Sequence, residues 1–165
     1  MSEQVDQGSG FHVYGTSGAL KFESGSNESG RPVLVVDGCN KVGSSYDWAN
    51  KTILQISDRE LPGLLCCVLG VTVEYTAQHH GAQRNKSIHL FNQPERERLY
   101  VKLSRPEYAV RVPLTPDAVF RLGALSLQVL CAQTGFDSAT CLAILRGTAG
   151  RLYSATPRVP QALDR

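Results

Sequence analysis

Hydrophobic and polar residues alternate along many short segments of this chain, and two longer segments are apolar on almost every side. A period of two is typical of strands that bury one face, whereas a segment that is apolar all round is typical of a covered helix. The alternation predicts eight strands in two groups of four, over residues 11–14, 19–23, 31–37 and 48–56 and over residues 71–77, 86–92, 98–104 and 107–112.

The first group of strands leads into the first apolar segment. Ser57 and Glu60 have the spacing of a capping box, in which each residue satisfies a free backbone group of the other. A helix is therefore predicted over 58–69, and Gly70 ends it.

The second group leads into a longer apolar segment. Thr115 stands at the N-cap and Pro116 at the first helical position, so a helix is predicted through Ala132, with Gly135 as its stop. Its polar positions form one narrow stripe, made of Asp117, Arg121 and Gln128.

Four strands followed by an apolar helix thus occur twice. We expect an α+β fold of duplicated β-β-β-β-α units, with two antiparallel four-stranded sheets packed across each other and two apolar helices. A shorter helix is predicted over 138–146. The chain then divides into a disordered leader (1–10), a single domain (11–147) and a flexible basic tail (148–165).

Two helices this apolar need cover on most of their circumference. A symmetric oligomer would supply it, and the alternative is that both helices cover the sheets within one monomer. The oligomer hypothesis places six apolar side chains at the interface, namely Leu64, Leu65, Val119, Leu122, Leu125 and Val129.

Composition narrows the functional classes only slightly. The 165 residues carry a net charge of +2, which does not by itself indicate a nucleic-acid binder. The chain has no apolar run of membrane-spanning length and no signal-peptide pattern at its start. Five cysteines without a C-x-x-C pair indicate reduced, buried thiols, so we expect a cytoplasmic protein.

Catalytic and metal-binding patterns are missing from the sequence. The four histidines lack the spacing of metal ligands, the serines lack a nucleophile-elbow context, and no glycine-rich loop precedes a helix as in a phosphate cradle. We therefore predict no enzyme, no metal and no cofactor.

The alternation in 86–92 and 98–104 places aromatic and basic side chains on the polar face of a sheet. Bases stack on rings and phosphates meet cations, which is what sequence-tolerant binding of single strands requires. The alternative is that these residues only solvate the sheet and pair across strands. The candidate binding residues are Lys21, Trp48, Lys51, Lys86, His89, Phe91, Arg98, Tyr100 and Lys102.

The order of these motifs resembles the Whirly family of single-stranded nucleic-acid-binding proteins, and also the related guide-RNA-binding proteins of kinetoplastid mitochondria. The matching sequence covers residues 11–137. Its motifs are Val13-Tyr14, Gly18-Ala19-Leu20, Tyr46-Asp47-Trp48 through Lys51 to Ser57 and Glu60, Lys86-Ser87-Ile88, and the Thr115 helix through Gly135-Phe136-Asp137. One departure concerns the family's Lys-Gly-Lys-Ala-Ala segment, which is linked there to binding and higher assembly. The same place reads Gly15-Thr16-Ser17-Gly18-Ala19 here and has no lysine.

The resemblance implies crossed four-stranded sheets, helices at the centre of a tetramer, and single strands running along sheet surfaces. We therefore expect a homotetramer that binds single-stranded DNA or RNA with little sequence preference, with no membrane and no small-molecule substrate as partner. The alternative is an oligomeric interaction or transcription-regulatory subunit with the same fold and weak or no nucleic-acid binding. The near-neutral charge and the missing hairpin lysines favour this alternative.

Overall fold

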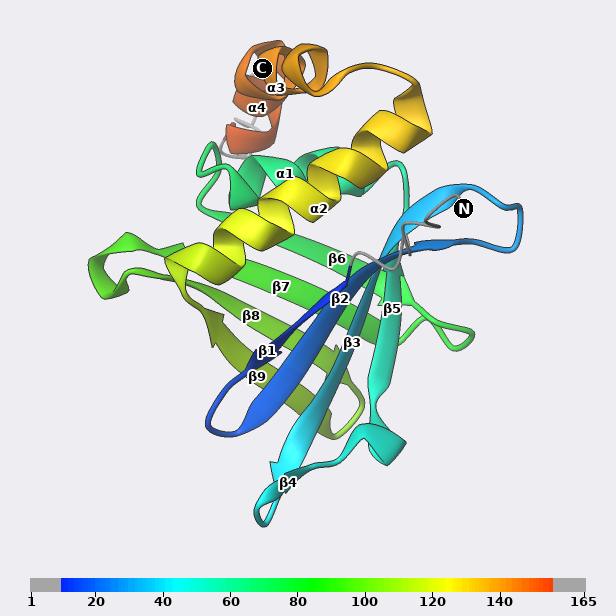
Figure 1. The fold of residues 1–165 in the computed structure, drawn as a ribbon, viewed down its shortest axis with the longest axis vertical. Helices are drawn as coiled ribbons and strands as arrows, with labels where there is room; N and C mark the ends of the chain where they lie inside the picture. Colours follow the sequence, from blue (N-terminus) through cyan, green and yellow to red (C-terminus); the bar gives the residue numbers. More distant parts are fainter. Residues whose placement is uncertain (1–9, 156–165) are drawn as a thin grey trace, which may run out of the picture.

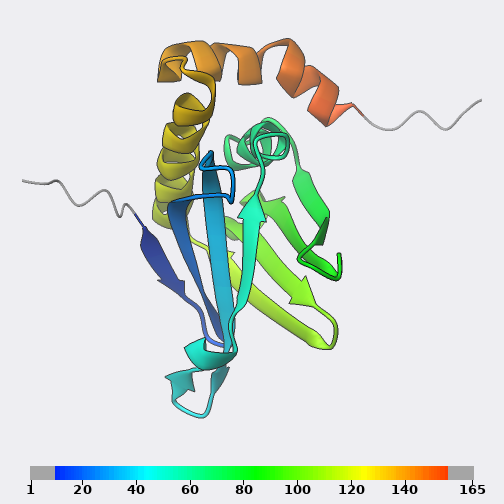
Figure 2. The same cartoon turned by 90° about the vertical axis from the view of Figure 1, so that its right-hand side faces the viewer.

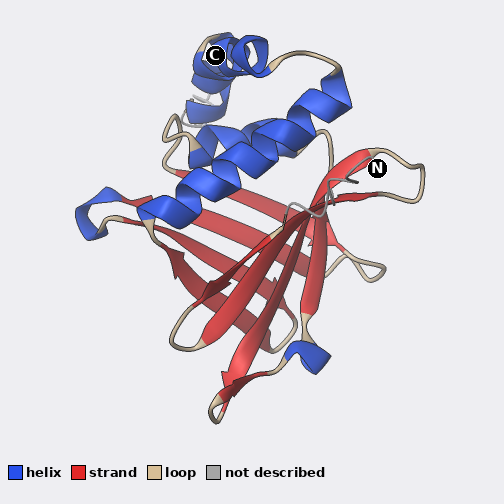
Figure 3. Cartoon of the chain, in the orientation of Figure 1, coloured by secondary structure: helices blue, strands red, loops and turns tan. Residues whose placement is uncertain are grey.

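A computed structural model of the chain describes residues 10–155. Within them the chain is α+β, with two antiparallel sheets of five and four strands and four α-helices. The strands of one sheet run across those of the other, and the helices gather at one end of both sheets (Figures 1 and 3). The predicted leader, apart from Gly10, and the last ten residues of the predicted tail lie outside the described residues.

The first sheet contains the strands of the first half of the chain. Its members are β1 (Phe11–Tyr14), β2 (Gly18–Ser26), β3 (Pro32–Val42), β4 (Ser45–Tyr46) and β5 (Thr52–Ile56). All pairs are antiparallel, in the order β1-β2-β3-β4, and β5 also pairs with β3. The short strand β4 adds a fifth member that the alternation did not predict.

The second sheet is a simple antiparallel meander. It consists of β6 (Glu74–His80), β7 (Lys86–Gln93), β8 (Arg98–Arg105) and β9 (Tyr108–Leu114), in that order. Leu99, Val101 and Leu103 of β8 are buried and alternate with partly exposed residues, as the pattern predicts. The two sheets approach closely at Gly38, where a Cβ atom would lie 2.9 Å from side-chain carbons of both Leu20 and Leu103.

Four helices follow the strands: α1 (Leu61–Val68), α2 (Pro116–Thr134), α3 (Ser138–Arg146) and α4 (Thr148–Ser154). Helix α2 packs on α1 and on strands of both sheets, whereas α3 and α4 run across the top of the molecule (Figure 2). Part of the predicted tail is therefore helical. None of the helices between residues 10 and 155 is long and apolar enough to cross a membrane.

Several predicted boundaries are wrong. Strands β2 and β3 continue to Ser26 and Val42, beyond their predicted ends at Glu23 and Asp37, and three other elements begin a few residues late, each for a local reason. Residues Trp48–Asn50 form a 3-10 turn, η1, so the strand predicted over 48–56 begins only at Thr52. Helix α1 begins at Leu61, because Pro62 has no N–H to donate and is accommodated only in the first turn. Only half of the predicted capping box forms. The Glu60 carboxylate accepts a hydrogen bond from the Ser57 N–H (2.9 Å), but the Ser57 hydroxyl donates to the same carboxylate (3.0 Å) and the Glu60 N–H donates to the Ser57 carbonyl (3.1 Å).

The strand predicted from Val71 begins at Glu74 instead. The N–H groups of Val71 and Thr72 donate to the Cys66 carbonyl and close the end of α1. They are therefore not available to a sheet ladder.

The helices are covered by the chain's own sheets and by one another. Leu64, Leu65, Leu122, Leu125 and Val129 are at most 5% exposed and belong to the buried core, and Val119 packs partly exposed against it. Five of the six predicted interface residues are therefore already buried within one chain. The monomer alternative accounts for their burial, and the oligomer interface stays a prediction.

The predicted polar stripe of α2 faces solvent. Asp117, Arg121 and Gln128 are exposed, and so are Phe120, at 78%, and Ala124. The side of α2 that remains open thus contains one large apolar residue among polar ones.

Candidate nucleic-acid interface

The second sheet brings the central group of predicted binding residues together. Strands β7 and β8 pair so that His89 lies opposite Lys102 and Phe91 opposite Tyr100. Directly opposed residues in an antiparallel pair point to the same face. The prediction that these four side chains share one surface is therefore confirmed; we call it the β7–β8 face.

Charges around the β7–β8 face are mostly positive. The Arg98 guanidinium lies 5.5 Å from the centre of the Tyr100 ring, and its Nε donates to Gln93 (2.7 Å). Arg111 of β9 is exposed and lies opposite Lys102. Arg98 and Arg111 thus extend this face across three strands.

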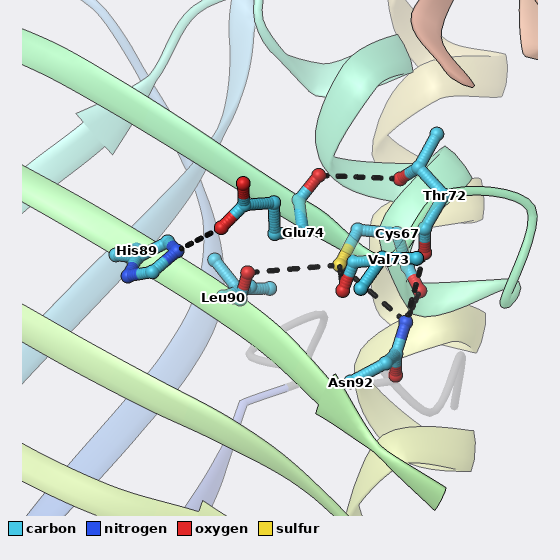
Figure 4. A network of polar contacts seen from close by, with 7 residues as sticks. All are labelled: Cys67, Thr72, Val73, Glu74, His89, Leu90 and Asn92. Carbon is cyan, nitrogen blue, oxygen red and sulfur yellow. Dashed lines mark hydrogen bonds and ion pairs between the residues drawn. The ribbon is translucent and has the colours of Figure 1, made fainter. Parts of the chain in front are cut away.

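One carboxylate reduces this positive charge. The His89 Nε2 lies 2.9 Å from Oε2 of Glu74, which is 60% exposed on the neighbouring strand β6 (Figure 4). Glu74 also lies opposite Phe91 in the β6–β7 register. A phosphate near Phe91 would therefore meet a negative charge as well as the surrounding cations.

The end of β7 is held in place by hydrogen bonds to the loop after α1. The Asn92 side-chain amide donates to the carbonyls of Cys67 (2.7 Å) and Thr72 (3.1 Å), and the Asn92 N–H donates to the Val73 carbonyl (2.8 Å) (Figure 4). Because these bonds join β7 to the buried helix α1, the Phe91 and His89 rings, one and three positions before Asn92, lie on a fixed strand.

Three predicted binding residues lie on the other sheet. Lys21 is on β2, opposite Asp37 of β3, while Trp48 and Lys51 belong to η1 and the residue that follows it. They do not extend the β7–β8 face. The structure divides the candidates into two surfaces on two different sheets.

The first sheet has an aromatic row that the sequence analysis missed. The His12 and Tyr14 rings stack with centroids 5.7 Å apart, Trp48 meets His12 edge-on at 5.6 Å, and Tyr46 lies 5.2 Å from Tyr14. Lys41 sits over the Tyr46 ring at 5.6 Å. The alternation of 11–14 indicated that His12 and Tyr14 share a face, but no local signal connects them to Tyr46 and Trp48.

A half-buried ion pair lies on the same sheet as this aromatic row: Asp37 is opposite Lys21, which is opposite His12. The Lys51 Nζ is 2.9 Å from Oδ2 of Asp37, which is only 4% exposed, and this bond and charge raise the pKa of the Lys51 ammonium. The other carboxylate oxygen of Asp37 has no hydrogen-bond partner among the described residues. Lys51 is therefore held as a cation.

Lys86, the ninth candidate, lies between the two surfaces. Its Nζ donates to the Ile53 carbonyl on β5 (3.2 Å), and it lines a groove of about 460 Å³ at the border of the two sheets. Arg31 and His80 line the same groove, but Arg31 is paired with Asp58 (3.0 Å) and His80 with Glu60 (2.6 Å).

The remaining candidate chemistry is limited. All five thiols are free, and four are buried, whereas Cys131 is partly exposed. Burial raises the pKa of the Cys67 thiol to about 12, which keeps it protonated and unreactive at neutral pH. Between residues 10 and 155 no cluster of three or more His, Cys, Asp or Glu side chains is placed to hold a metal ion.

Comparison with protein-family models and with curated proteins finds no match for this chain. The resemblance to the Whirly family rests on the order and spacing of the quoted motifs, and it stays a prediction. The functional argument therefore depends on the two surfaces described above.

Proposed function

We propose that this chain binds single-stranded DNA or RNA with little sequence preference, and that the β7–β8 face is its main binding surface. The observation that supports this most directly is the cross-strand register, which puts Phe91 beside Tyr100 and His89 beside Lys102. Two rings and adjacent cations on neighbouring strands match the spacing that an extended single strand requires.

The energetics favour single strands over duplex. Stacking of one base on an aromatic side chain is worth about 1–3 kcal/mol, and bases are free to stack only when they are unpaired. Every base has a π-face, so such binding tolerates any sequence. The cations contribute a salt-dependent part, with a slope of about 0.7 for each phosphate contact.

We propose the aromatic row of the first sheet, made of His12, Tyr14, Tyr46 and Trp48, as a second stacking surface. Lys21, Lys41 and Lys51 lie around it. The rings already pack on one another, yet Tyr14 is 60% exposed and offers an open face to a base.

The test uses a fluorescently labelled thirty-nucleotide oligo(dT), an oligo(U) of the same length and a duplex, with affinity measured by anisotropy at several salt concentrations. The triple variant Phe91→Ala, Tyr100→Ala, Lys102→Ala should weaken single-strand binding at least tenfold, because it removes two stacking partners and one phosphate contact. The matched control Phe136→Ala, Tyr153→Ala, Arg151→Ala removes two rings and one cation from exposed positions away from the sheet faces and from the groove beside Phe120, and should leave binding unchanged.

Two outcomes would contradict the proposal. Equal affinity of the wild type for duplex and single strands would exclude stacking as the source of binding. Equal affinity of the sheet triple variant and the wild type would exclude the β7–β8 face. Because Trp48 is the only tryptophan, quenching of its fluorescence by oligo(dT) reports separately on the first sheet.

We also propose that the two halves are duplicated β-β-β-β-α units as in the Whirly fold, and that the cytoplasmic protein is a homotetramer. The order of strands and helices supports the first statement. The open side of α2 supports the second, since Phe120 borders a groove of about 250 Å³ that Phe11 and Ala124 also line. Light scattering should show a tetramer that Phe120→Asp dissociates, and a wild-type monomer would exclude it.

A second candidate function is an interaction or transcription-regulatory subunit with weak or no nucleic-acid binding. The exposed apolar residues on the helices and on the loop between α2 and α3 favour it, because exposed apolar patches often contact a protein partner. They are Phe120, Phe136, Ile144 and Leu152, each more than half exposed. This alternative predicts that the wild type binds neither oligonucleotide even at low salt.

A further inference from the structure

The two sheets are joined near the aromatic row by one arginine. Arg105 stands at the end of β8 in the second sheet, and its guanidinium makes three hydrogen bonds to the last residue of η1 and the residue after it. It donates to the Asn50 side-chain oxygen (2.8 Å), to the Asn50 carbonyl (3.2 Å) and to the Lys51 carbonyl (3.2 Å). Asn50 ends the turn that begins with Trp48, and Lys51 directly follows it.

The Arg105 guanidinium itself is held by a contact with an aromatic ring. It lies 4.2 Å from the centre of the Tyr108 ring, its cross-strand partner on β9. The Tyr108 hydroxyl in turn accepts a hydrogen bond from the Asn40 N–H (2.9 Å) on β3, and the Asn40 side-chain amide donates to the Ala109 carbonyl (3.1 Å). Arg105, Tyr108 and Asn40 thus form a continuous link between the two sheets.

All three acceptors of Arg105 are neutral oxygens, and no carboxylate pairs with it among residues 10–155. A planar guanidinium presents several donors in a fixed fork and stacks on a ring, which an ammonium does not do. This geometry suits a residue that fixes the position of a turn.

We propose that Arg105 is a positioning residue for the first-sheet surface: it holds the η1 turn so that Trp48 and Lys51 lie in line with the aromatic row. The proposal rests on the proposed nucleic-acid binding for its functional meaning. Its structural part concerns Trp48 in the free protein and can be measured without a ligand.

The free protein gives the first measurement. Because Trp48 is the only tryptophan, its anisotropy and its quenching by acrylamide report on this turn alone. Arg105→Ala and Arg105→Lys should both lower the anisotropy and increase the quenching, since neither retains the planar fork. Asn50→Ala removes only the 2.8 Å bond and should shift both signals in the same direction by less. Arg96→Ala, on the exposed turn η2 (Pro94–Arg96), is the matched control and should change neither.

Binding to labelled oligo(dT) gives the second measurement. Trp48→Ala/Lys51→Ala should weaken binding about five- to a hundredfold, as expected for loss of one stacked base, and Arg105→Ala should weaken it by part of that factor. In the Trp48→Ala/Lys51→Ala background, Arg105→Ala should change the affinity less than about twofold, because the residues through which it acts are already gone.

The outcomes separate the possibilities. Unchanged Trp48 signals in Arg105→Ala would overturn the positioning role, whatever the protein binds. Equal losses from Arg105→Ala in both backgrounds, with full rescue by Arg105→Lys, would also overturn it and make Arg105 a direct phosphate contact. A wild type that binds no oligonucleotide would refute the proposed function, while the Trp48 signals would still decide the structural part.

Discussion

Neutralising Glu74 should strengthen binding of single-stranded nucleic acid, although the change removes an ion pair. Its carboxylate lies 2.9 Å from the His89 ring, and Glu74 stands opposite Phe91 on β6, at the edge of the β7–β8 face. Both side chains of the pair are well exposed, at 38% and 60%, so the pair itself contributes at most about 1 kcal/mol to stability. The change Glu74→Gln keeps the shape of the side chain and removes only its charge.

The expected gain follows from the position of Glu74. Directly opposed residues have Cβ atoms about 5 Å apart, so a base stacked on Phe91 would carry its phosphate roughly 7 Å from the carboxylate. Two unit charges at that distance in water repel by about 0.6 kcal/mol, which is about threefold in Kd. Screening at about 0.15 M salt reduces this to about 1.5-fold. Glu74→Lys changes the charge by two and should give about sevenfold at low salt.

Anisotropy titrations of labelled oligo(dT) at low and at physiological salt measure this series. The controls Glu28→Gln and Glu28→Lys make the same charge changes on the exposed turn between β2 and β3, away from the β7–β8 face. Equal gains from the Glu28 and Glu74 variants would show that net charge alone is responsible. Weaker binding by Glu74→Lys would show that phosphates do not approach this face.

Two further predictions concern stability. Gly63→Ala should lower the free energy of unfolding by about 1–3 kcal/mol, because the new Cβ would lie 2.8 Å from the Tyr75 ring and 3.1 Å from the Tyr153 ring. Gly123→Ala has its closest contact at 3.4 Å and should raise the free energy of unfolding by up to about 1 kcal/mol, so equal urea midpoints for the two variants would refute this packing argument. Burial raises the pKa of the Cys67 thiol to about 12, from about 8.5 in an unfolded chain. The protonated thiol should therefore contribute its whole share to the free energy of unfolding below about pH 8.5. That share should fall as the pH rises towards 12, because the unfolded chain loses the proton first. Urea midpoints between pH 7 and 10 should fall less in Cys67→Ala than in the wild type, and parallel curves would contradict the assignment.

Much of the fold was predictable because it depends on local patterns. The alternation of Leu99, Val101 and Leu103 fixes which side of β8 is buried, and the same period places each of the eight predicted strands in a strand of the structure. The cap at Thr115 and the left-handed Gly135 delimit α2 for reasons within a few residues. Among the boundaries that failed, those at Trp48 and Val71 are places where a turn or a helix end takes the backbone groups that a strand would need. Strand β3 continues past its predicted end because Lys41 and Val42 pair with β4.

The candidate site was predictable only within one hairpin. Because η2 closes the hairpin of β7 and β8, sequence spacing alone determined that His89, Phe91, Tyr100 and Lys102 share a face. Lys21, Trp48 and Lys51 have equally suggestive side chains, but nothing in the local sequence says which sheet they join.

The sequence by itself thus determined the period, the caps and the pairing of adjacent strands, since these depend on backbone geometry over a few residues. Only the tertiary structure decided that the sheets cover α1 and α2 within one chain, that Trp48 meets His12 and Tyr14, and that Arg105 links the sheets. These contacts join segments distant in sequence, and the packing of the two sheets as a whole selects them. A pattern of hydrophobic and polar positions indicates that one face of an element is buried. It does not indicate which other element buries that face, because many apolar surfaces of similar shape would do so equally well.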